Sequence, residues 1–589
     1  MQKIHSFGRT KPIVMAMTMA VAAIALTACG GSSSSKSSSE EKPNFTDVAK
    51  AFDCEPSSTQ GKRVICIGSA DDLSDANVQN SLTEALAMAE TGDTFVLPQG
   101  RYNFKNTIEF NGAVDGVEVS NLTFRGAGMK KTIIDTNGAS ADGFLINDTN
   151  NLVFEDFGIY ESNNNALKVK GSDGVIIRRL ATVWETDFKS TNGAYGVYPV
   201  ECKNILIEDS FVQGSADAGI YVGQSEDIVV RNNIAIKNVA GIEIENSKRA
   251  DVYGNTAKGN TGGILIFDLP IGNGIYGAGV RVFDNEVIAN NAPNFANKSA
   301  FAGGVHIVPP GTGVIVLSTS DVEIYNNIIK DHQTTSIAVS SYILADENVV
   351  ATPKEDVGDG VNSYGDIHPL ATTFMDGWSP LVRNINIHDN TISVADGIDN
   401  PEGELISEII AGYKTLHSLY PDIANGKVTV PHILYDGVGE LLANTPHPDP
   451  VFGGASIMQA LVLGINQIAT SVATLPDTEM FTPIDVSLFG AYPPEGGVCQ
   501  SKNGIDNRTL FAASVFETQP TQNNFKDGEP LSKLEQLQSD FSFAWSIMDD
   551  PSGVMSCASG YTGSPATVTF GDNKYGCLED DLENDSCAL

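Results

Sequence analysis

Basic residues are scarce in this 589-residue chain, which has 36 Lys and Arg against 73 Asp and Glu and a formal net charge of −37. So acidic a surface disfavours nucleic acid and repels bare polyanions, unless bound Ca²⁺ reverses the charge locally. Solubility in a salty habitat explains this charge at least as well. The sequence also lacks a P-loop lysine motif, a Gly-x-Ser-x-Gly elbow and a His-Glu-x-x-His pair, which argues against the chemistries that those motifs serve.

Long apolar runs are absent except for residues 13–26, which follow three basic residues near the N-terminus. A run of this length is too short for a stable membrane span and is typical of a secretory signal. It ends in Leu-Thr-Ala-Cys at residues 26–29, which resembles the cleavage box of bacterial lipoproteins. The resemblance implies cleavage before Cys29, lipidation of its thiol and, because Gly30 follows, sorting to the outer membrane.

The first two segments predicted are therefore a lipoprotein signal peptide at residues 1–28 and a lipidated, Ser-rich tether at residues 29–45. We expect a protein of the cell envelope that is anchored by lipid. The sequence leaves open whether its body faces the periplasm or the outside.

Cysteine is sparse as well, with seven residues after Cys29. In an exported protein these favour disulfides. Cys54 and Cys66 can pair near the start, which leaves Cys202 as a free thiol. The other four cysteines lie in the last hundred residues and are expected to staple the C-terminal tail: Cys499, Cys557, Cys577 and Cys587.

What the chain does contain is a repeat between Leu152 and Asn390, in which apolar residues and a polar residue precede an Asn. In chain order the repeated position is occupied by Phe157, Leu180, Ser210, Asn233, Asn255, Asn285, Asn327 and Asn390. The spacing is 22 or 23 residues wherever no insertion lengthens it. A fixed short period of this kind indicates stacked structural repeats.

Within each repeat the apolar residues alternate with polar ones, which predicts β-strands. The side chains expected to face the core are Val175, Ile177, Ile205, Ile207, Ile228 and Val230, and those expected to face water are Arg178, Glu208 and Arg231. A second strand follows as Gly-Ile-x-Val at residues 219–222, 241–244, 263–266 and 304–307. Coils this short have no room for a helix beside these strands.

A right-handed parallel β-helix, an all-β solenoid, fits this pattern. Its coils bury an apolar interior, and Asn side chains at one turn stack into a hydrogen-bonded ladder along the axis. We therefore assign the repeated Asn residues a structural role.

A helical cap is expected at the N-terminal end, because residues 82–89 have helical spacing and Gly92 follows. The next string, Gly-Asp-Thr-Phe-Val-Leu-Pro-Gln-Gly-Arg-Tyr at 92–102, resembles the first coil of the pectate-lyase-like superfamily. That superfamily includes bacterial lyases, mannuronan C5-epimerases and many β-helix repeat proteins without an assigned function. The resemblance covers about residues 80 to 395, and it implies the fold more than the chemistry.

We place the capped β-helix at residues 46–395 and a decorated, partly helical C-terminal region with its Cys-containing cap at 396–589. Helical spacing occurs at residues 402–420, 456–475 and 530–548. Residues 431–437 and 497–499 are interpreted as late coils between these insertions.

Candidate chemistry lies in the middle position of each Gly-Ile-x-Val segment, which should project outward and form a line with a spacing of about 4.8 Å per coil. This line is predicted to run through Lys168, Tyr198, Tyr221, Glu243, Leu265 and His306. Any solvated strand face carries some polar residues, so an ordinary surface is the competing interpretation. However, an amine, two phenols, a carboxylate and an imidazole over a span of about 20 Å fit an enzyme that moves protons on a sugar chain.

The residues predicted to be catalytic are Lys168, Tyr198, Tyr221, Glu243 and His306, and those predicted to bind substrate are Glu245, Asp217, Gln224 and Asp268. Lys168 or a bound Ca²⁺ would hold a uronate carboxylate, while Tyr, His or Glu would exchange the adjacent proton. The sequence does not predict a particular cofactor, and no metal ligands are assigned. Asp187 and Lys189 lie in a nearby loop.

A second motif, Tyr-Gly-Asp-Ile-His-Pro at residues 364–369, has a partial likeness to the Tyr-Gly-x-Asp-Pro-His signature of mannuronan C5-epimerases. It lacks one residue after Gly and has Ile367 where the family has Pro. Pectate lyases place a catalytic Arg above acidic Ca²⁺ ligands, whereas Arg231 and Arg281 belong to the other strand of the repeat.

The sequence leads us to expect a monomeric, lipid-anchored lyase or C5-epimerase of uronate-containing polysaccharides. The alternative is a non-catalytic accessory protein that binds a glycan or another envelope component. A purely structural adhesin ranks last, because capped ends and heavy negative charge oppose self-association.

Overall fold

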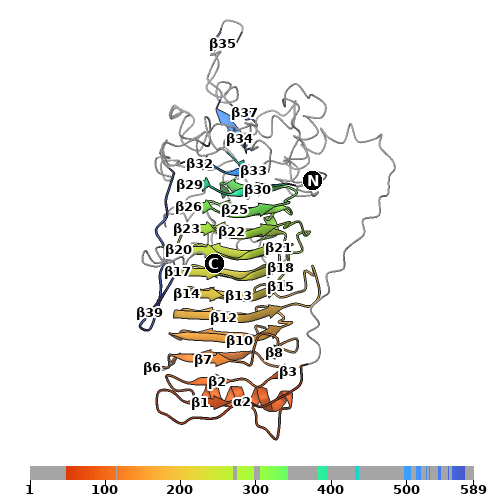
Figure 1. Ribbon diagram of the computed structural model, residues 1–589, viewed down its shortest axis with the longest axis vertical. Coiled ribbons are helices and arrows are strands. Elements are labelled where there is room, and N and C mark those ends of the chain that lie inside the picture. The colour runs from red at the N-terminus through yellow and green to blue at the C-terminus, as the bar shows by residue number, and fades with distance from the viewer. Residues whose placement is uncertain are drawn as a thin grey trace, which may run out of the picture.

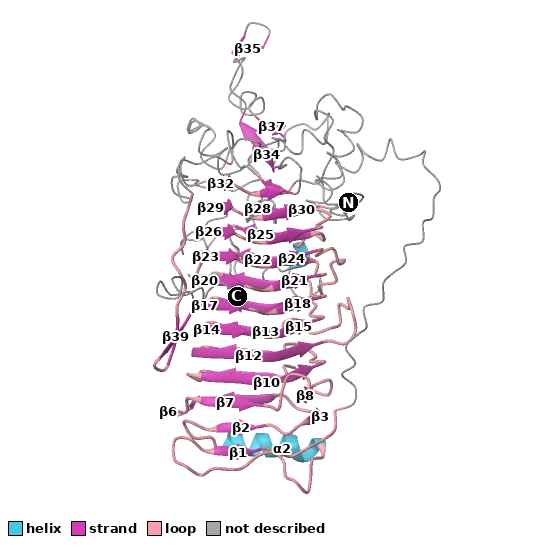
Figure 2. Cartoon of the chain, viewed as in Figure 1, coloured by secondary structure: helices cyan, strands magenta, loops and turns pink. Residues whose placement is uncertain are grey.

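The computed structural model of the protein describes residues 48–269 except 115 and 140, and then 275–297, 305–342, 382–394, 432–436, 497–505, 512–518, 525–526, 529–530, 541–544, 555 and 560–576. These residues form a tall stack of coils, each contributing short strands that pair with the coil above and the coil below (Figure 1). Figure 2 shows the strands in layers, with a helix at the N-terminal end.

Each coil has three faces. Two of them belong to a 21-stranded sheet that consists of two ladders joined through the long strands β10 (Leu152–Tyr160) and β12 (Asp173–Val183). Besides these, the first ladder contains β1 (Val64–Cys66), β2 (Thr94–Val96), β7 (Leu122–Arg125), β14 (Lys203–Glu208), β17 (Glu226–Arg231), β20 (Lys248–Tyr253), β23 (Ala278–Phe283), β26 (Ser320–Tyr325), β29 (Arg383–His388) and β32 (Val498–Ser501).

The second ladder contains β3 (Gly100–Asn103), β8 (Thr132–Asp135), β15 (Phe211–Gln213), β18 (Ile234–Ile236), β21 (Thr256–Lys258), β24 (Glu286–Ile288), β27 (Ile328–Lys330), β30 (Thr391–Ser393) and β33 (Gly504–Ile505). The third face is a 12-stranded sheet of β4 (Ile108–Asn111), β9 (Phe144–Asn147), β11 (Leu167–Lys170), β13 (Val197–Val200), β16 (Ala218–Gly223), β19 (Ala240–Glu245), β22 (Gly262–Phe267), β25 (Thr312–Leu317), β28 (Thr335–Ser340), β31 (Ile433–Tyr435), β34 (Ala512–Thr518) and β37 (Phe541–Ala544). Short hairpins pair β5 (Ala113–Val114) with β6 (Val117–Glu118) and β35 (Phe525–Lys526) with β36 (Glu529–Pro530).

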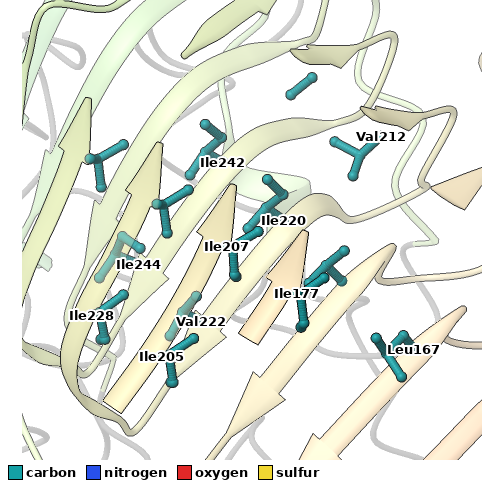
Figure 3. Packing of buried hydrophobic residues seen from close by; sticks show 14 of the residues in the cluster. Leu167, Ile177, Ile205, Ile207, Val212, Ile220, Val222, Ile228, Ile242 and Ile244 are labelled. Carbon is teal, nitrogen blue, oxygen red and sulfur yellow. The ribbon is translucent and has the colours of Figure 1, made fainter. Parts of the chain in front are cut away.

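The interior is filled by the aliphatic side chains that the alternation predicted. Ile220, Val222, Ile242 and Ile244 point inward from the third face and are at most 1% exposed (Figure 3). From the first ladder the same core receives Val175, Ile177, Ile205, Ile207, Ile228 and Val230, all fully buried. Burial of each such side chain contributes about 2 kcal/mol, so repetition along the axis stabilises the whole stack.

The repeated Asn residues form the predicted ladder. From Asn233 through Asn390, each side-chain Nδ2 donates to Oδ1 of the next Asn at 2.9–3.0 Å, and the ladder continues to Asn503. A parallel ladder that the sequence analysis missed runs through Asn238, Asn260 and Asn290 to His332. The Asn side chains therefore hydrogen-bond the turns of successive coils to one another, which is a structural role.

At the N-terminal end, helix α2 (Asp75–Ala87) lies under the first coil (Figure 1). Ser74 accepts a hydrogen bond from the backbone N–H of Asn77 and so caps the helix start. The apolar side chains of Val78 and Leu82 belong to the core. The disulfide Cys54–Cys66 holds the segment before the helix, as predicted, and Cys202 is a buried free thiol.

In the C-terminal region, β31 pairs with β28 and β32 pairs with β29, so residues 433–435 and 498–501 continue the stack. Cys499 is disulfide-bonded. The helix expected at 530–548 is wrong at Phe541–Ala544, which forms β37 antiparallel to β34. Its Phe-Ser-Phe-Ala sequence also has a period of two, and pairing with β34 selects the strand. The helices expected at 402–420 and 456–475 lie outside the described residues.

Residues 560–576, which we call the strap, return along the outside of the first ladder and end in the hairpin of β38 (Val568–Phe570) and β39 (Asn573–Tyr575), as Figure 1 shows. Their backbone N–H groups donate to side chains of several coils: Gly563 to Glu323, Ala566 to Asp251 and Thr569 to Asn204. Val568 is fully buried against the outer apolar residues of this ladder. No helix among the described residues is long and apolar enough to span a membrane.

Candidate functional site

The line of outward positions on the third face has the predicted register over its first five members. Strand pairing places Lys168 beside Tyr198, Tyr221 beside Glu243, and Glu243 beside Leu265. The pairing of Val197 with Ile220 sets Tyr198 next to Tyr221. These side chains therefore belong to one continuous row on β11, β13, β16, β19 and β22.

His306 does not belong to this row, so its prediction as a member of the stripe is wrong. Residues Val305–Ile307 form the 3₁₀ helix η1, and the next strand of the third face is β25. There Ile315 pairs with Leu265 and takes the expected place of the histidine. The segment Gly313-Val314-Ile315-Val316 repeats the same local pattern a few residues later, and only the strand pairing distinguishes the two copies.

The row is also less open to solvent than an ordinary strand face. Lys168 and Tyr198 are half-buried, but Tyr221 is 4% exposed and Glu243 only 1%. The expectation of a solvated row is therefore wrong at these two positions. A carboxyl group buried on the outside of a solenoid requires a specific environment, because desolvation disfavours its charged form.

Part of that environment is a cluster of three tyrosines. The ring of Tyr195 lies 4.5 Å from that of Tyr198 and 4.6 Å from that of Tyr221, and the last two rings are 5.0 Å apart in an edge-to-face arrangement. The sequence analysis did not identify Tyr195. The sequence feature that could have indicated Tyr195 is the 30-residue step between Leu180 and Ser210, because the extra residues form a loop before β13.

This loop, residues 184–196, is fastened to neighbouring coils. Asp187 pairs with Lys237 at 3.2 Å, and the rings of Phe188 and Phe295 meet edge to face at 5.6 Å. Asn192 donates to the backbone carbonyl of Gly214. The loop therefore holds Tyr195 in place over the row, and Asp187 serves to anchor it.

The phenol of Tyr221 forms a close pair with Glu245. Its Oη donates to Oε1 of Glu245 at 2.8 Å, and the side chain of Gln224 donates to both groups at 3.2 and 3.3 Å. Burial raises the pKa of Glu245 to about 7, although the hydrogen bonds from Tyr221 and Gln224 lower it. A carboxyl that titrates near neutral pH is suited to accepting and returning a proton.

Two further carboxyls accompany Glu245. Burial, followed by the charges of Glu245 and Asp217, raises the pKa of Glu243 well above its ordinary value, and Oε2 of Glu243 is buried without a hydrogen-bond partner. Burial and the charge of Glu245 likewise raise the pKa of Asp217. The three carboxyls consequently hold protons at neutral pH more readily than exposed ones do.

The pKa values of the three tyrosine phenols are raised as well. Burial is the main cause that raises the pKa values of Tyr195, Tyr198 and Tyr221, and the surrounding carboxylates add to it. The phenols therefore remain protonated unless a neighbouring carboxylate accepts their proton.

Lys168 brings the positive charge of the site. Its Nζ lies 4.9 Å from the ring centre of Tyr198 and forms no ion pair with another described residue. In contrast, Lys170 on the same strand pairs with exposed Glu201 at 3.1 Å. Lys168 is therefore the amine that remains to bind an anion at this end of the row.

Asp268 follows β22 and is 4% exposed. Its Oδ1 accepts the backbone N–H of Gly277 at 2.8 Å, and burial raises its pKa well above the ordinary value. It influences the site through its charge interaction with Glu245. The described residues contain no group of His, Cys, Asp and Glu arranged to hold a metal ion. The Tyr-Gly-Asp-Ile-His-Pro motif at 364–369 lies outside the described residues.

Comparison with known proteins agrees with the architecture. Residues 106–308 match the model of the family described as the right handed beta helix region. A search of the curated proteins gives no significant match.

Three solved structures are similar to this chain at low identity. The A-module of mannuronan C-5 epimerase AlgE4 from Azotobacter vinelandii is 16% identical, with 55% of this chain and 86% of that chain covered and a TM-score of 0.31. Polygalacturonase from Erwinia carotovora ssp. carotovora is 13% identical over 50% and 94% of the two chains, with a TM-score of 0.31. Alginate lyase from Paenibacillus sp. strain FPU-7 is 13% identical over 57% and 89%, with a TM-score of 0.27. The family match and the stacked parallel strands together identify the coils of this chain as a right-handed parallel β-helix.

Proposed function

We propose that the protein is a polysaccharide-acting enzyme, a lyase or C5-epimerase of uronate-containing chains. The observation that carries this proposal is the hydrogen bond from Tyr221 to Glu245 in a buried cluster that also presents Lys168. Both reactions begin when a base removes the proton next to a uronate carboxylate. Tyr221 can take that proton while its own proton passes to Glu245.

Lys168 would hold the uronate carboxylate during this step. Its charge stabilises the electron density that moves into the carboxylate when the proton leaves. Tyr198, which lies under the amine, offers an aromatic surface to the sugar ring. The raised pKa values of Asp217 and Glu243 favour their uncharged forms, which would limit the repulsion that an anionic substrate otherwise meets in so acidic a protein.

The second candidate is a non-catalytic glycan-binding or envelope accessory protein. It is favoured by the three clustered tyrosine rings, because aromatic surfaces bind sugars without any proton transfer. The two proposals differ in what Glu245→Gln does. Binding alone would weaken moderately, whereas an enzyme would lose turnover.

We further propose that the protein is attached to the cell envelope, in the outer membrane, by lipid on Cys29. The support for this is the Leu-Thr-Ala-Cys box and the Ser-rich segment that follows it. Such a tether would place the β-helix near envelope glycans.

Incubation of the purified protein with alginate, pectate and glycosaminoglycans tests the enzymatic proposal. Ultraviolet absorbance detects unsaturated chain ends, and proton NMR detects changed uronate residues. We expect one of these signals from the wild-type protein and its loss in Tyr221→Phe and Glu245→Gln. Tyr575→Phe, on the strap hairpin, is the matched control and should retain activity. Equal activity of Tyr221→Phe and the wild type would refute the role of this pair.

A further inference from the structure

A column of outward side chains runs along the first ladder beneath the strap. Alternate residues of the same strands form the core, and strand pairing places one outward residue of each coil in this column. We call the column the strap face, and its members are all buried: Ile176, Leu206, Val229, Asp251, Arg281, Glu323 and Asn386. The strap face is therefore apolar over three coils and polar or charged over the next four.

The polar half of the strap face holds the strap by its backbone. The N–H groups of Gly563 and Ala566 donate to Oε2 of Glu323 at 2.9 Å and to Oδ2 of Asp251 at 3.1 Å. In the opposite direction, the side chain of Asn386 donates to a backbone carbonyl of the strap at 2.8 Å. In these three contacts the solenoid contributes side chains and the strap contributes main chain, as in the binding of a peptide.

The spacing of the two acidic acceptors fits an extended chain. Asp251 and Glu323 occupy the same column two coils apart, a distance of about 9.6 Å. Gly563 and Ala566 are three residues apart, and three residues of extended, polyproline-like chain span about 9.3 Å. A straight segment therefore reaches both acceptors with its N–H groups.

The strap face also selects particular side chains. A Cβ at Gly560 would overlap the side chain of Asn386, and a Cβ at Gly563 would lie 2.6 Å from Cγ of Arg281. On the apolar half, Val568 is fully buried among the apolar members of the face. The face therefore fits a segment with two glycines three residues apart and an apolar residue five positions further on.

The strap is separate from the sheets of the solenoid. Among the described strands β38 and β39 pair only with each other, whereas the first-ladder strands from β12 to β29 pair with a coil on both sides. Departure of the strap would leave those ladders intact and expose three adjacent apolar side chains. Soluble proteins rarely leave such a patch open, so the vacated face would bind another segment of the same kind.

We propose that the strap face is a peptide-binding site, that the strap is its built-in ligand, and that a second copy of this chain is the partner that supplies the same ligand. The ligand is an extended segment with the Gly-x-x-Gly-x-x-Ala-x-Val pattern of residues 560–568. The same contacts form whichever chain the strap comes from, as when two protomers exchange an identical element. This site lies on the first ladder, so it does not depend on the chemistry of the third face.

Mixing two full-length variants tests the proposal. Gly563→Val disrupts the strap and keeps the face, whereas Val229→Asp disrupts the face and keeps the strap; Val229 points out of the solenoid, so the core is unchanged. Each variant alone should be monomeric, and their mixture should form a 1:1 heterodimer, measured by light scattering after size exclusion. Circular dichroism and thermal melting establish that each variant is folded, and Val568→Asp replaces Gly563→Val if the latter is not.

The matched control mixes Gly563→Val with a chain that carries both Gly563→Val and Val229→Asp. This mixture contains no intact strap and should stay monomeric. A heterodimer in the control would show that association does not use the strap and would overturn the proposal.

A labelled peptide of residues 560–576 gives a second measurement. Fluorescence anisotropy should show one peptide bound to each Gly563→Val chain, and the same peptide carrying Gly563→Val should bind at least roughly tenfold more weakly, because overpacking at this position is costly. Equal binding of the two peptides, or no binding to the folded variant, would overturn the site. Peptide binding without a heterodimer would support the site and overturn the second copy as its partner.

Discussion

Glu245 makes the stability of the folded protein depend on pH. Its side chain is 8% exposed, and burial raises its pKa from the ordinary 4.5 to about 7. Between these values the folded chain keeps a proton that the unfolded chain has released, so the free energy of unfolding falls as the pH rises. A shift of this size corresponds to on the order of 3 kcal/mol, fully present below pH 4.5 and lost as the pH passes about 7.

The Glu245→Gln substitution removes this titration and keeps an oxygen that can accept the hydrogen bond from Tyr221. The neighbouring carboxyls Asp217, Glu243 and Asp268 still titrate, but the charge of Glu245 no longer opposes their ionisation. We therefore expect the variant to lose less unfolding free energy than the wild type between about pH 5 and about pH 8, by on the order of 3 kcal/mol.

Urea unfolding at a series of pH values, followed by far-ultraviolet circular dichroism, measures this difference. Glu201→Gln is the matched control, because Glu201 is exposed and pairs with Lys170 at the surface. The control should follow the wild-type pH dependence. A Glu245→Gln variant with the same slope as the wild type would show that Glu245 is not the group responsible.

Three further predictions concern the Asn ladder, the Lys168 amine and the lipidation of Cys29. Asn285→Ala removes side-chain hydrogen bonds to Val252, Asn255 and Asn327 and should lower the unfolding free energy by about 4 kcal/mol in urea titrations, whereas exposed Glu286→Ala should change it little. Lys168→Met should raise KM for uronate polymers roughly tenfold and also lower kcat, since it removes a charge that binds the substrate carboxylate and stabilises the charge that develops on it, and unchanged KM and kcat would contradict this role. Cys29→Ala should abolish incorporation of labelled fatty acid in growing cells and release the protein from membranes; labelling that persists would place any lipid elsewhere.

The alternation of apolar residues was sufficient to predict the coil interior and the Asn ladder. Ile220 and Val222 face the core because strand residues alternate in direction, and Asn233 to Asn390 stack because each occupies the same position of its repeat. The same logic placed Lys168, Tyr198, Tyr221 and Glu243 in one row.

Prediction from the local pattern failed where an insertion contained a second segment that resembles the Gly-Ile-x-Val strand. Gly304-Val305-His306-Ile307 and Gly313-Val314-Ile315-Val316 read alike, and only the second pairs with β22. The helix expected near Phe541 failed for a related reason, because residues 541–544 also have the period of a strand and pairing with β34 selects it.

By itself, the sequence determined the solenoid, its core and the direction of the side chains along the row, because these depend on periodicities of two residues and of one coil. Only the tertiary structure decided that Tyr195 lies on Tyr198 and Tyr221, and that Glu243 and Glu245 are buried near half-buried Asp217. Those contacts depend on the path of a loop and on what covers the sheet. Neither the loop path nor the covering of the sheet produces a periodic pattern in the sequence, because each results from packing between segments that are distant in sequence.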